Sequence, residues 1–250
     1  MWRDKRVHVV VPAYREARLL PRMLRRVPGW VDRIIVVDDG SDDGTAEAAQ
    51  STADPRVELV RHTVNRGVGA AIVSGYARAF ELGAHVAVVM AGDDQMDPSD
   101  LEAVVAPVAL GHADYVKGNR LVHPDARHMP APRRIAGRAL AFATRRATGL
   151  CVGDTQCGYT ALAASAAAQL PLSELWPGYG YPNDLLGLLA ARGLTVREVP
   201  VRPVYADEVS GVRPWHALTV LRVLFRRRRL ERERAQPACA ETGIDPLKAG

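Results

Sequence analysis

The chain has 250 residues, 48% of them hydrophobic, so it is long enough to bury a sizeable core and is not globally disordered. Its three cysteines, Cys151, Cys157 and Cys239, exclude a disulfide framework, lack the spacing of a cysteine zinc site and suggest a reducing compartment. No stretch reaches the ~18 apolar residues of a membrane span, and the apolar run after Arg6 is too short for a signal peptide.

The net charge of +5 is concentrated near the end of the chain. Between Arg213 and Arg234 there are eight arginines and two glutamates, a balance of +6, so the rest of the chain sums to −1. Because the basic character is local, we expect no nucleic-acid partner.

Apolar β-branched runs alternate with segments of helical periodicity up to residue 120. In chain order, the pattern predicts a strand at 7–11, a helix at 17–27, a strand at 34–37, a helix at 45–51, a strand at 57–60, a helix at 69–82, a strand at 86–90, a helix at 98–110 and a strand at 115–117. This alternation is typical of an α/β domain with a mostly parallel central sheet and flanking helices.

The second half of the chain is less regular. Residues 123–134 contain three prolines and predict a loop, followed by helices at 135–148 and 183–191, a strand at 195–199 and a terminal helix at 215–234. That last helix has an apolar stripe that includes Leu218, Leu221 and Phe225, followed by Arg226–Arg229. The composition is typical of an amphipathic helix on an anionic membrane surface, although docking on the core is the alternative.

Acidic residues follow three of the predicted strands. Glu16 follows the first strand, Asp38 and Asp39 the second, and Asp93, Asp94 and Gln95 the fourth. Because the carboxyl ends of parallel strands meet at one edge of a sheet, we expect these side chains to converge there. Carboxylates beside an amide oxygen suit a hard cation such as Mg²⁺ or Mn²⁺ that also grips substrate phosphates.

A basic segment follows the parallel part of the chain. Residues 126–153 contain no acid but six arginines, and Lys117 and Arg120 precede them. Arg134 and Arg138 are one helical turn apart and share a face, so they are candidates to bind a phosphate, with an ordinary solvated helix face as the alternative.

Together these motifs resemble family 2 glycosyltransferases. The specific part is Val10–Ala17 (VVPAYREA) followed by Val36–Thr45 (VVDDGSDDGT). The chain also resembles the branch of this family that makes dolichyl- and polyprenyl-phosphate sugars. The matching segments are Asn65–Ala71, the Asp93 cluster, Gly118–Arg120, Asp154–Tyr159 and the segment through Tyr205 and Ser210. Many relatives carry a C-terminal transmembrane part, and we expect no counterpart of it here.

The resemblance implies a GT-A fold and a set of site residues. Nucleotide contacts would come from Pro12, Ala13, Tyr14, Glu16, Asp39 and Asp93, metal ligands from Asp93 and Gln95, and acceptor-phosphate contacts from Arg120, Arg134 and Arg138. One family acid is replaced by Ala91, which leaves open whether Asp94 compensates or the metal is held more weakly.

The resemblance also implies a single GT-A domain at 1–212, with a nucleotide-sugar half at 1–120 and an acceptor half at 121–212. A basic amphipathic helix at 213–235 and a flexible tail at 236–250 would follow. The expected protein is cytoplasmic and peripherally bound to the inner face of the cell membrane.

The implied reaction moves a hexose, with inversion, from a nucleotide-diphosphate sugar (GDP-mannose or UDP-glucose type) to a polyprenyl phosphate. Asp93, Arg120 and Arg134 would serve catalysis, and Asp184 is the candidate base if the acceptor is instead a hydroxyl. The alternatives are a soluble transferase with a hydroxyl acceptor and a degenerate, non-catalytic nucleotide-sugar-binding protein.

Overall fold

The computed structural model describes residues 1–204 and 216–235. Trp215, the segment with Tyr205 and Ser210, and the predicted tail at 236–250 lie outside the described residues.

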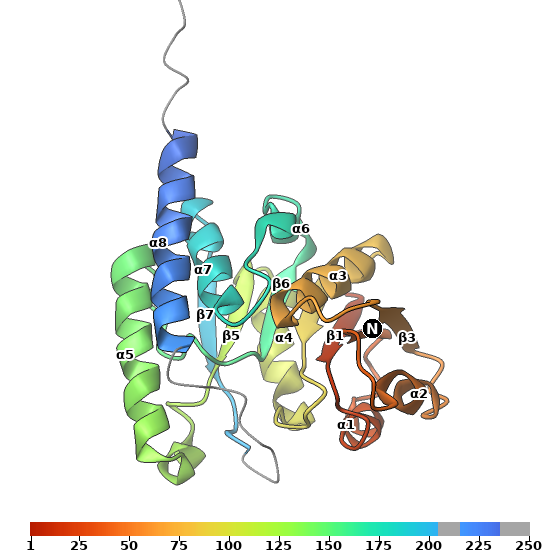
Figure 1. Ribbon diagram of the computed structural model, residues 1–250. Helices are drawn as coiled ribbons and strands as arrows, with labels where there is room; N and C mark the ends of the chain where they lie inside the picture. Colours follow the sequence, from red (N-terminus) through yellow and green to blue (C-terminus); the bar gives the residue numbers. More distant parts are fainter. Residues whose placement is uncertain (205–215, 236–250) are drawn as a thin grey trace, which may run out of the picture.

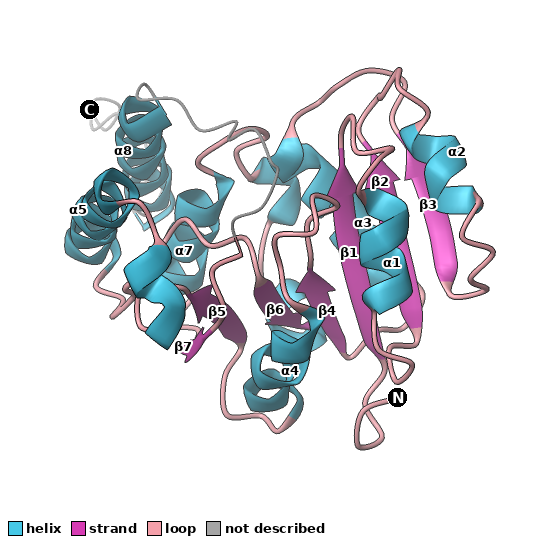
Figure 2. Cartoon of the chain, turned by 90° about the horizontal axis from the view of Figure 1, so that it is seen from below, coloured by secondary structure: helices cyan, strands magenta, loops and turns pink. Residues whose placement is uncertain are grey.

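The strands between residues 7 and 200 form one seven-stranded sheet in the order β3-β2-β1-β4-β6-β5-β7 (Figures 1 and 2). The strands are β1 (Val7–Ala13), β2 (Arg33–Asp38), β3 (Val57–Arg61), β4 (Val86–Val89), β5 (Tyr115–Asn119), β6 (Thr160–Ala163) and β7 (Val196–Pro200). All neighbours pair in parallel except β6, which is antiparallel to both β4 and β5. The mostly parallel α/β sheet predicted from the sequence is confirmed.

The strand β6 was not predicted. Its four residues, Thr-Ala-Leu-Ala, lack the β-branched run that identifies the other strands, and their alanines equally suit a helix. Inserted between β4 and β5, this strand joins the two halves of the chain into one sheet. The helix after the proline-rich segment also begins earlier than predicted, at Ala131, because Pro132 fits the first turn of a helix.

Helices cover both faces of the sheet. One face carries α1 (Leu20–Arg26), α2 (Thr45–Gln50) and α4 (Leu101–Ala109), and the other carries α3 (Val68–Glu81), α6 (Ala164–Ala167) and α7 (Tyr181–Ala191). Short 3-10 turns lie at Pro98–Asp100, Pro124–His128 and Leu172–Glu174. Alternate residues of β1 face opposite cores: Val9 packs in the first and Val10 in the second. Burial on both faces explains the continuous apolar runs of these strands.

The two longest helices, α5 (Ala131–Thr148) and α8 (His216–Ala235), lie beside α7 at one end of the molecule (Figures 1 and 2). Val220, Val223 and Leu224 of α8 are buried, whereas Leu218 and Phe225 are 69% and 70% exposed. The helix is therefore docked through one face, while the other exposes both apolar side chains and arginines to solvent. Among the described residues, no helix is both long and apolar enough to cross a bilayer.

Helix α3 lies so close to β1 that residue 75 must be glycine. A Cβ at this position would come within 2.1 Å of a Val10 methyl group. We expect Gly75→Ala to destabilise the protein by about 1–3 kcal/mol, because α3 would have to move away from the sheet. Gly137→Ala, at a half-buried position of α5 where a Cβ would have its nearest neighbour at 3.8 Å, should be neutral or stabilising. Urea unfolding of both variants checks the difference, and equal stabilities would contradict this packing.

Candidate functional site

The loops that follow β1, β2 and β4 are joined at one edge of the sheet. Backbone N–H groups of Asp39 and Gly92 donate to the carbonyls of Ala13 (2.9 Å) and Pro12 (3.3 Å), respectively. The carbonyls at the end of β1 therefore hold the loops of both neighbouring strands. The convergence of strand ends expected from the sequence is present.

The Asp39 carboxylate organises the loop that begins α3. It accepts hydrogen bonds from the backbone N–H groups of Arg66 (2.9 Å) and Gly67 (2.7 Å) and lies 2.6 Å from Nδ1 of His62. The far nitrogen of His62 contacts the Ser74 hydroxyl at 2.9 Å. His62 was not singled out from the sequence, although its place directly after β3 follows the same strand-end rule.

The segment after β1 is fixed by the loop after β2. The side chains of Ser41, Thr45 and Asp43 accept hydrogen bonds from the backbone N–H groups of residues 15, 16 and 17, respectively. Tyr14, in contrast, is exposed, with the Arg15 guanidinium 5.3 Å from its ring centre. The serine, threonine and acids of this motif thus place Tyr14 and Glu16 at the rim of the sheet edge.

The carboxylates of Glu16, Asp43 and Asp93 are close enough at this edge to influence one another. Burial, together with the nearby charges of Asp93 and Asp43, raises the pKa of Glu16 to about 7. Burial and Asp93 likewise raise the pKa of Tyr179, which reaches the site from a distant loop. Asp93 therefore lies close enough to Glu16 and Tyr179 to influence the protonation of both.

The donor set around Asp93 fits a divalent cation. The carboxylate of Asp93 also accepts the backbone N–H of Gln95 at 3.1 Å, which makes a tight turn that brings residues 93 and 95 together. In the described part of the chain, no group of three or more His, Cys, Asp or Glu side chains is arranged to hold a metal. Few protein ligands, all oxygens, suit Mg²⁺ or Mn²⁺ that completes its shell with water and phosphate oxygens.

The Asp94 carboxylate points toward α1. Its buried carboxylate binds Arg22 at 2.5 Å and Arg26 at 2.8 Å, both from α1, and its backbone has a left-handed φ of 58°. With both oxygens bound by arginines, Asp94 does not replace the acid missing at Ala91. The sequence alone does not show that Asp93 and Asp94 have different partners, because the two aspartates are adjacent.

Arg120 is oriented by a buried network. Its Nε and Nη2 atoms donate to the two oxygens of Asp154 at 2.8 and 3.1 Å, and 27% of its side chain stays exposed. Burial opposes ionisation of Asp154, but Arg120 outweighs it and lowers the pKa of that carboxyl. Glu198 in turn accepts the backbone N–H groups of Gly153 and Asp154. The guanidinium is thus held in one orientation at the end of β5.

Arg134 and Arg138 lie near the start of α5. Arg134 is half-buried, with Nη1 3.5 Å from the carbonyl of Ala126, whereas Arg138 is exposed. Of the two, Arg134 is the more strongly tied to the segment that follows Arg120.

Asp184 is fully buried, away from solvent. Its carboxylate accepts the Trp176 backbone N–H at 2.8 Å and two hydrogen bonds from Arg227 of α8, at 2.8 and 2.9 Å. A carboxylate so enclosed has no access to an acceptor hydroxyl. Asp184 is therefore not placed to act as the general base that the sequence suggested.

A loop at residues 175–180, which we name the bridge loop, connects this buried pair to the sheet edge. The carbonyl of Pro177 accepts the backbone N–H groups of Gly69 (2.7 Å) and Ala70 (3.1 Å), and the loop also carries Tyr179. A Cβ on Gly69 would lie 2.2 Å from the Trp176 carbonyl, so the glycines at 67 and 69 permit this approach. Nothing in the sequence indicated that these distant segments meet.

Comparison with known proteins agrees with this geometry. The family described as Glycosyl transferase family 2 matches residues 8–164. The chain belongs to that family. It is 32% identical to the undecaprenyl-phosphate mannosyltransferase of Micrococcus luteus, over 82% of this chain and 88% of that protein. It is also 28% identical to the UDP-N-acetylglucosamine–dolichyl-phosphate N-acetylglucosaminyltransferase of Methanococcus voltae, over 89% of this chain and 95% of that one.

A similar fold occurs in a solved structure. Glucosyl-3-phosphoglycerate synthase from Mycobacterium tuberculosis, in complex with Mn²⁺, UDP-glucose and phosphoglyceric acid, superposes with a TM-score of 0.71. The match covers 90% of this chain and 80% of that one at 22% identity. The expected GT-A fold of this family 2 member is thereby confirmed.

The raised pKa of Glu16 makes the stability of the protein depend on pH. Between pH 4.5 and about 7 the folded state binds more protons than the unfolded state, so stability falls as the pH rises through this window. Glu16→Gln should remove that component. The stability of the variant relative to wild type should therefore be higher at pH 8 than at pH 5. Because Glu16 is partly exposed, we expect an effect on the order of 1 kcal/mol.

Urea unfolding at the two pH values, without divalent metal, measures this effect. Glu47→Gln, at an exposed position on α2, serves as the control and should keep the wild-type dependence. Identical pH dependence of wild type and Glu16→Gln would contradict the placement of Glu16 beside Asp93.

Proposed function

We propose that this family 2 glycosyltransferase moves a hexose from a nucleotide-diphosphate sugar to a polyprenyl phosphate at a membrane surface. The observation that carries the proposal is that the acidic segment with Asp93 follows β4 and Arg120, oriented by Asp154, follows β5, because these two strands run in the same direction on either side of β6 and so end at one edge of the sheet. One side suits a cation-bound diphosphate and the other an anionic acceptor. The similarity to transferases named for undecaprenyl and dolichyl phosphate supports the same acceptor class.

The donor would bind along the loops after β1, β2 and β4. Pro12, Ala13 and Tyr14 would line the base and ribose together with Glu16 and Asp39. Asp39 already accepts hydrogen bonds from His62 and two backbone N–H groups, so it is fixed before any nucleotide arrives. Preorganisation of this kind lowers the entropy lost on binding.

Asp93 and Gln95 would hold Mg²⁺ or Mn²⁺ beside the diphosphate. Such an ion, when bound, neutralises charge that develops on the leaving nucleoside diphosphate. The chain's own contribution is to place the Asp93 carboxylate by its turn with Gln95 and to keep Asp94 engaged with α1.

The acceptor phosphate would be bound by Arg120 and Arg134, with Arg138 at the outer rim. A phosphate is already anionic, so its oxygen attacks the anomeric carbon directly as the bond to the diphosphate breaks. A single in-line displacement inverts that carbon, and catalysis consists mainly of positioning and charge stabilisation. The hydroxyl-acceptor alternative requires a base, and Asp184 is buried in an ion pair.

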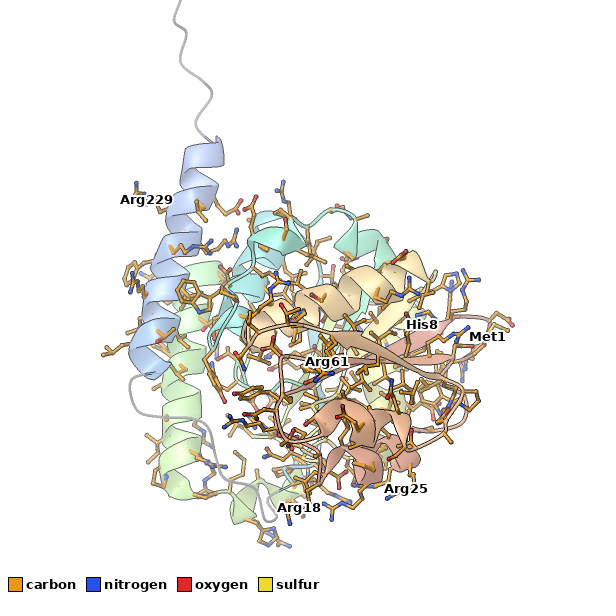
Figure 3. The ribbon with its side chains drawn as sticks, turned by 45° about the vertical axis from the view of Figure 1, so that its right-hand side comes forward. Met1, His8, Arg18, Arg25, Arg61 and Arg229 are labelled. Carbon is orange, nitrogen blue, oxygen red and sulfur yellow. The ribbon has the colours of Figure 1, made fainter. Side chains whose placement is uncertain are left out.

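The exposed faces of α5 and α8 would contact the membrane. Leu218, Leu221 and Phe225 of α8 are exposed at helical spacing, as is Phe142 of α5 at 71%. Arg222, Arg228 and Arg229 are exposed on α8, and Arg229 points away from the rest of the molecule (Figure 3). Apolar side chains among arginines match the interface of a membrane with anionic lipids. This surface would place the protein at the inner face of the cell membrane.

A direct test is to incubate the protein with Mn²⁺, undecaprenyl phosphate and a panel of UDP- and GDP-sugars. Mass spectrometry should detect a glycosyl-phosphate lipid with one donor. A product formed only on hydroxyl acceptors would favour the soluble alternative, and donor binding without turnover would favour the non-catalytic one.

Replacing the two neighbouring acids should have unequal effects on turnover. Asp93→Asn removes a charged oxygen from the proposed cation site and should reduce kcat by at least ~100-fold. Asp94→Asn leaves that site intact and loosens only the contacts with Arg22 and Arg26, so kcat should fall far less. Steady-state assays of glycolipid formation measure both, and the reverse ranking would show that Asp94 is the ligand.

The exposed face of α8 should control membrane binding without affecting the fold. The triple variant Leu218→Ser, Leu221→Ser and Phe225→Ser should reduce sedimentation with phosphatidylglycerol liposomes more than tenfold, since each apolar side chain contributes ~1 kcal/mol or more at the interface. Leu110→Ser, at an exposed leucine beyond α4, is the control and should sediment like wild type. Equal sedimentation of all three proteins would contradict this surface.

A further inference from the structure

The buried ion pair between Asp184 and Arg227 links the outer helix α8 to the loop that opens α3. Both side chains are at most 2% exposed, and Arg227 donates from Nε and Nη2 to the two carboxylate oxygens. Burial opposes the charge on Arg227, but the hydrogen bonds to Asp184 outweigh it and raise the pKa of the guanidinium. A paired charge this deeply buried fixes the position of both helices, because separating the partners leaves a desolvated charge.

The same carboxylate holds the bridge loop. Oδ2 of Asp184 accepts the backbone N–H of Trp176 at 2.8 Å. Arg226, next to Arg227 on α8, reaches the same oxygen at 3.3 Å and lies 5.9 Å from the centre of the Trp176 ring. Both arginines also approach the carbonyl of Glu174 at 3.3–3.4 Å. Arg226 and Arg227 of α8, together with Asp184 of α7, therefore hold Glu174 and Trp176 at the beginning of the bridge loop.

The next residue in the loop reaches the opposite side. The Pro177 carbonyl accepts the N–H groups of Gly69 and Ala70, in the first turn of α3, and the loop preceding that turn is bound by Asp39. Two residues further on, Tyr179 lies within electrostatic range of Asp93. Hydrogen bonds joined by short stretches of backbone thus connect α8, through Asp184, Trp176 and Pro177, to the proposed donor site.

We infer that Asp184 and Arg227 are positioning residues for the nucleotide-sugar site, acting through the bridge loop. This inference rests on the proposed function for the identity of the donor. Asp184, which the sequence suggested as a base for a hydroxyl acceptor, would instead hold the bridge loop beside the donor without touching the substrate.

The inference is tested with Asp184→Asn, Arg227→Met, their double variant and Arg227→Lys in the full chain. Methionine keeps an apolar stem, which here packs against Gly187, and the double variant leaves no buried charge unpaired. Leu224→Ala is the matched control: it removes a buried contact of α8 but touches neither Asp184 nor the bridge loop hydrogen bonds. Urea unfolding establishes how much stability each variant has lost.

Hydrogen exchange of apo protein is the first readout. Amides of Gly69 and Ala70 should exchange at least tenfold faster in the Arg227→Met and double variants, and near the wild-type rate in Leu224→Ala at comparable stability. Arg227→Lys should restore part of the protection. Unchanged exchange at these two amides in folded variants would overturn the inference.

Calorimetric titration of UDP and GDP with Mn²⁺ is the second readout. For the nucleotide that wild type binds, we expect Kd to rise on the order of tenfold in the Arg227→Met and double variants, and to stay unchanged in Leu224→Ala. Faster amide exchange with an unchanged Kd would overturn the positioning role. Failure of wild type to bind either nucleotide would instead count against the proposed function, while the exchange data would still test the connection.

Discussion

The burial of Glu16 at a sheet edge that it shares with Asp93 and Asp43 is the constraint on which the site depends. Burial first, and then the charges of Asp93 and Asp43, raise the pKa of Glu16, so a negative charge on Glu16 is unfavourable at the ends of β1 and β4. Under the proposed function, a divalent cation with its bound diphosphate would bind at this edge.

The surrounding structure keeps these carboxylates in place. Serine, threonine and aspartate side chains after β2 bind the backbone on which Glu16 sits, and the carbonyls at the end of β1 bind the loops after β2 and β4. On the other side, Asp94 is anchored to α1 by Arg22 and Arg26. Local hydrogen bonds at strand ends thus offset an electrostatic penalty at the point where chemistry is expected.

The sequence was sufficient for the features that depend on local pattern. The apolar runs gave β1 to β4, and the strand-end rule placed Glu16, Asp39 and Asp93 at one edge, because parallel strands share a direction. Features that depend on contacts between distant residues could not be predicted from the sequence. The strand β6 has no local signature, and the different orientations of Asp93 and Asp94 follow from a left-handed residue and two arginines some 70 positions away. Asp184 was selected as an acid near a helix start, and only the structure reveals its partner on α8.

Docking on the core, one of the two roles that the sequence left open for the terminal helix, is present in the structure. Val220, Val223 and Leu224 pack inside, and Arg227 pairs with Asp184, so the helix is part of the folded domain. Its remaining face, with Leu218, Leu221 and Phe225, stays exposed and apolar. Under the proposed function, this one helix would face the lipid that carries the acceptor and would also hold the loop beside the donor.

The central claim is that the carboxylate edge binds a nucleoside diphosphate through a divalent cation. Calorimetric titration of UDP and GDP into wild type and Asp93→Asn, each with and without Mn²⁺, tests it most directly. Wild type should bind one nucleotide at least tenfold more tightly with Mn²⁺ than without it, and Asp93→Asn should lose that gain. Equal affinity with and without Mn²⁺, or a gain that Asp93→Asn retains, would contradict the account.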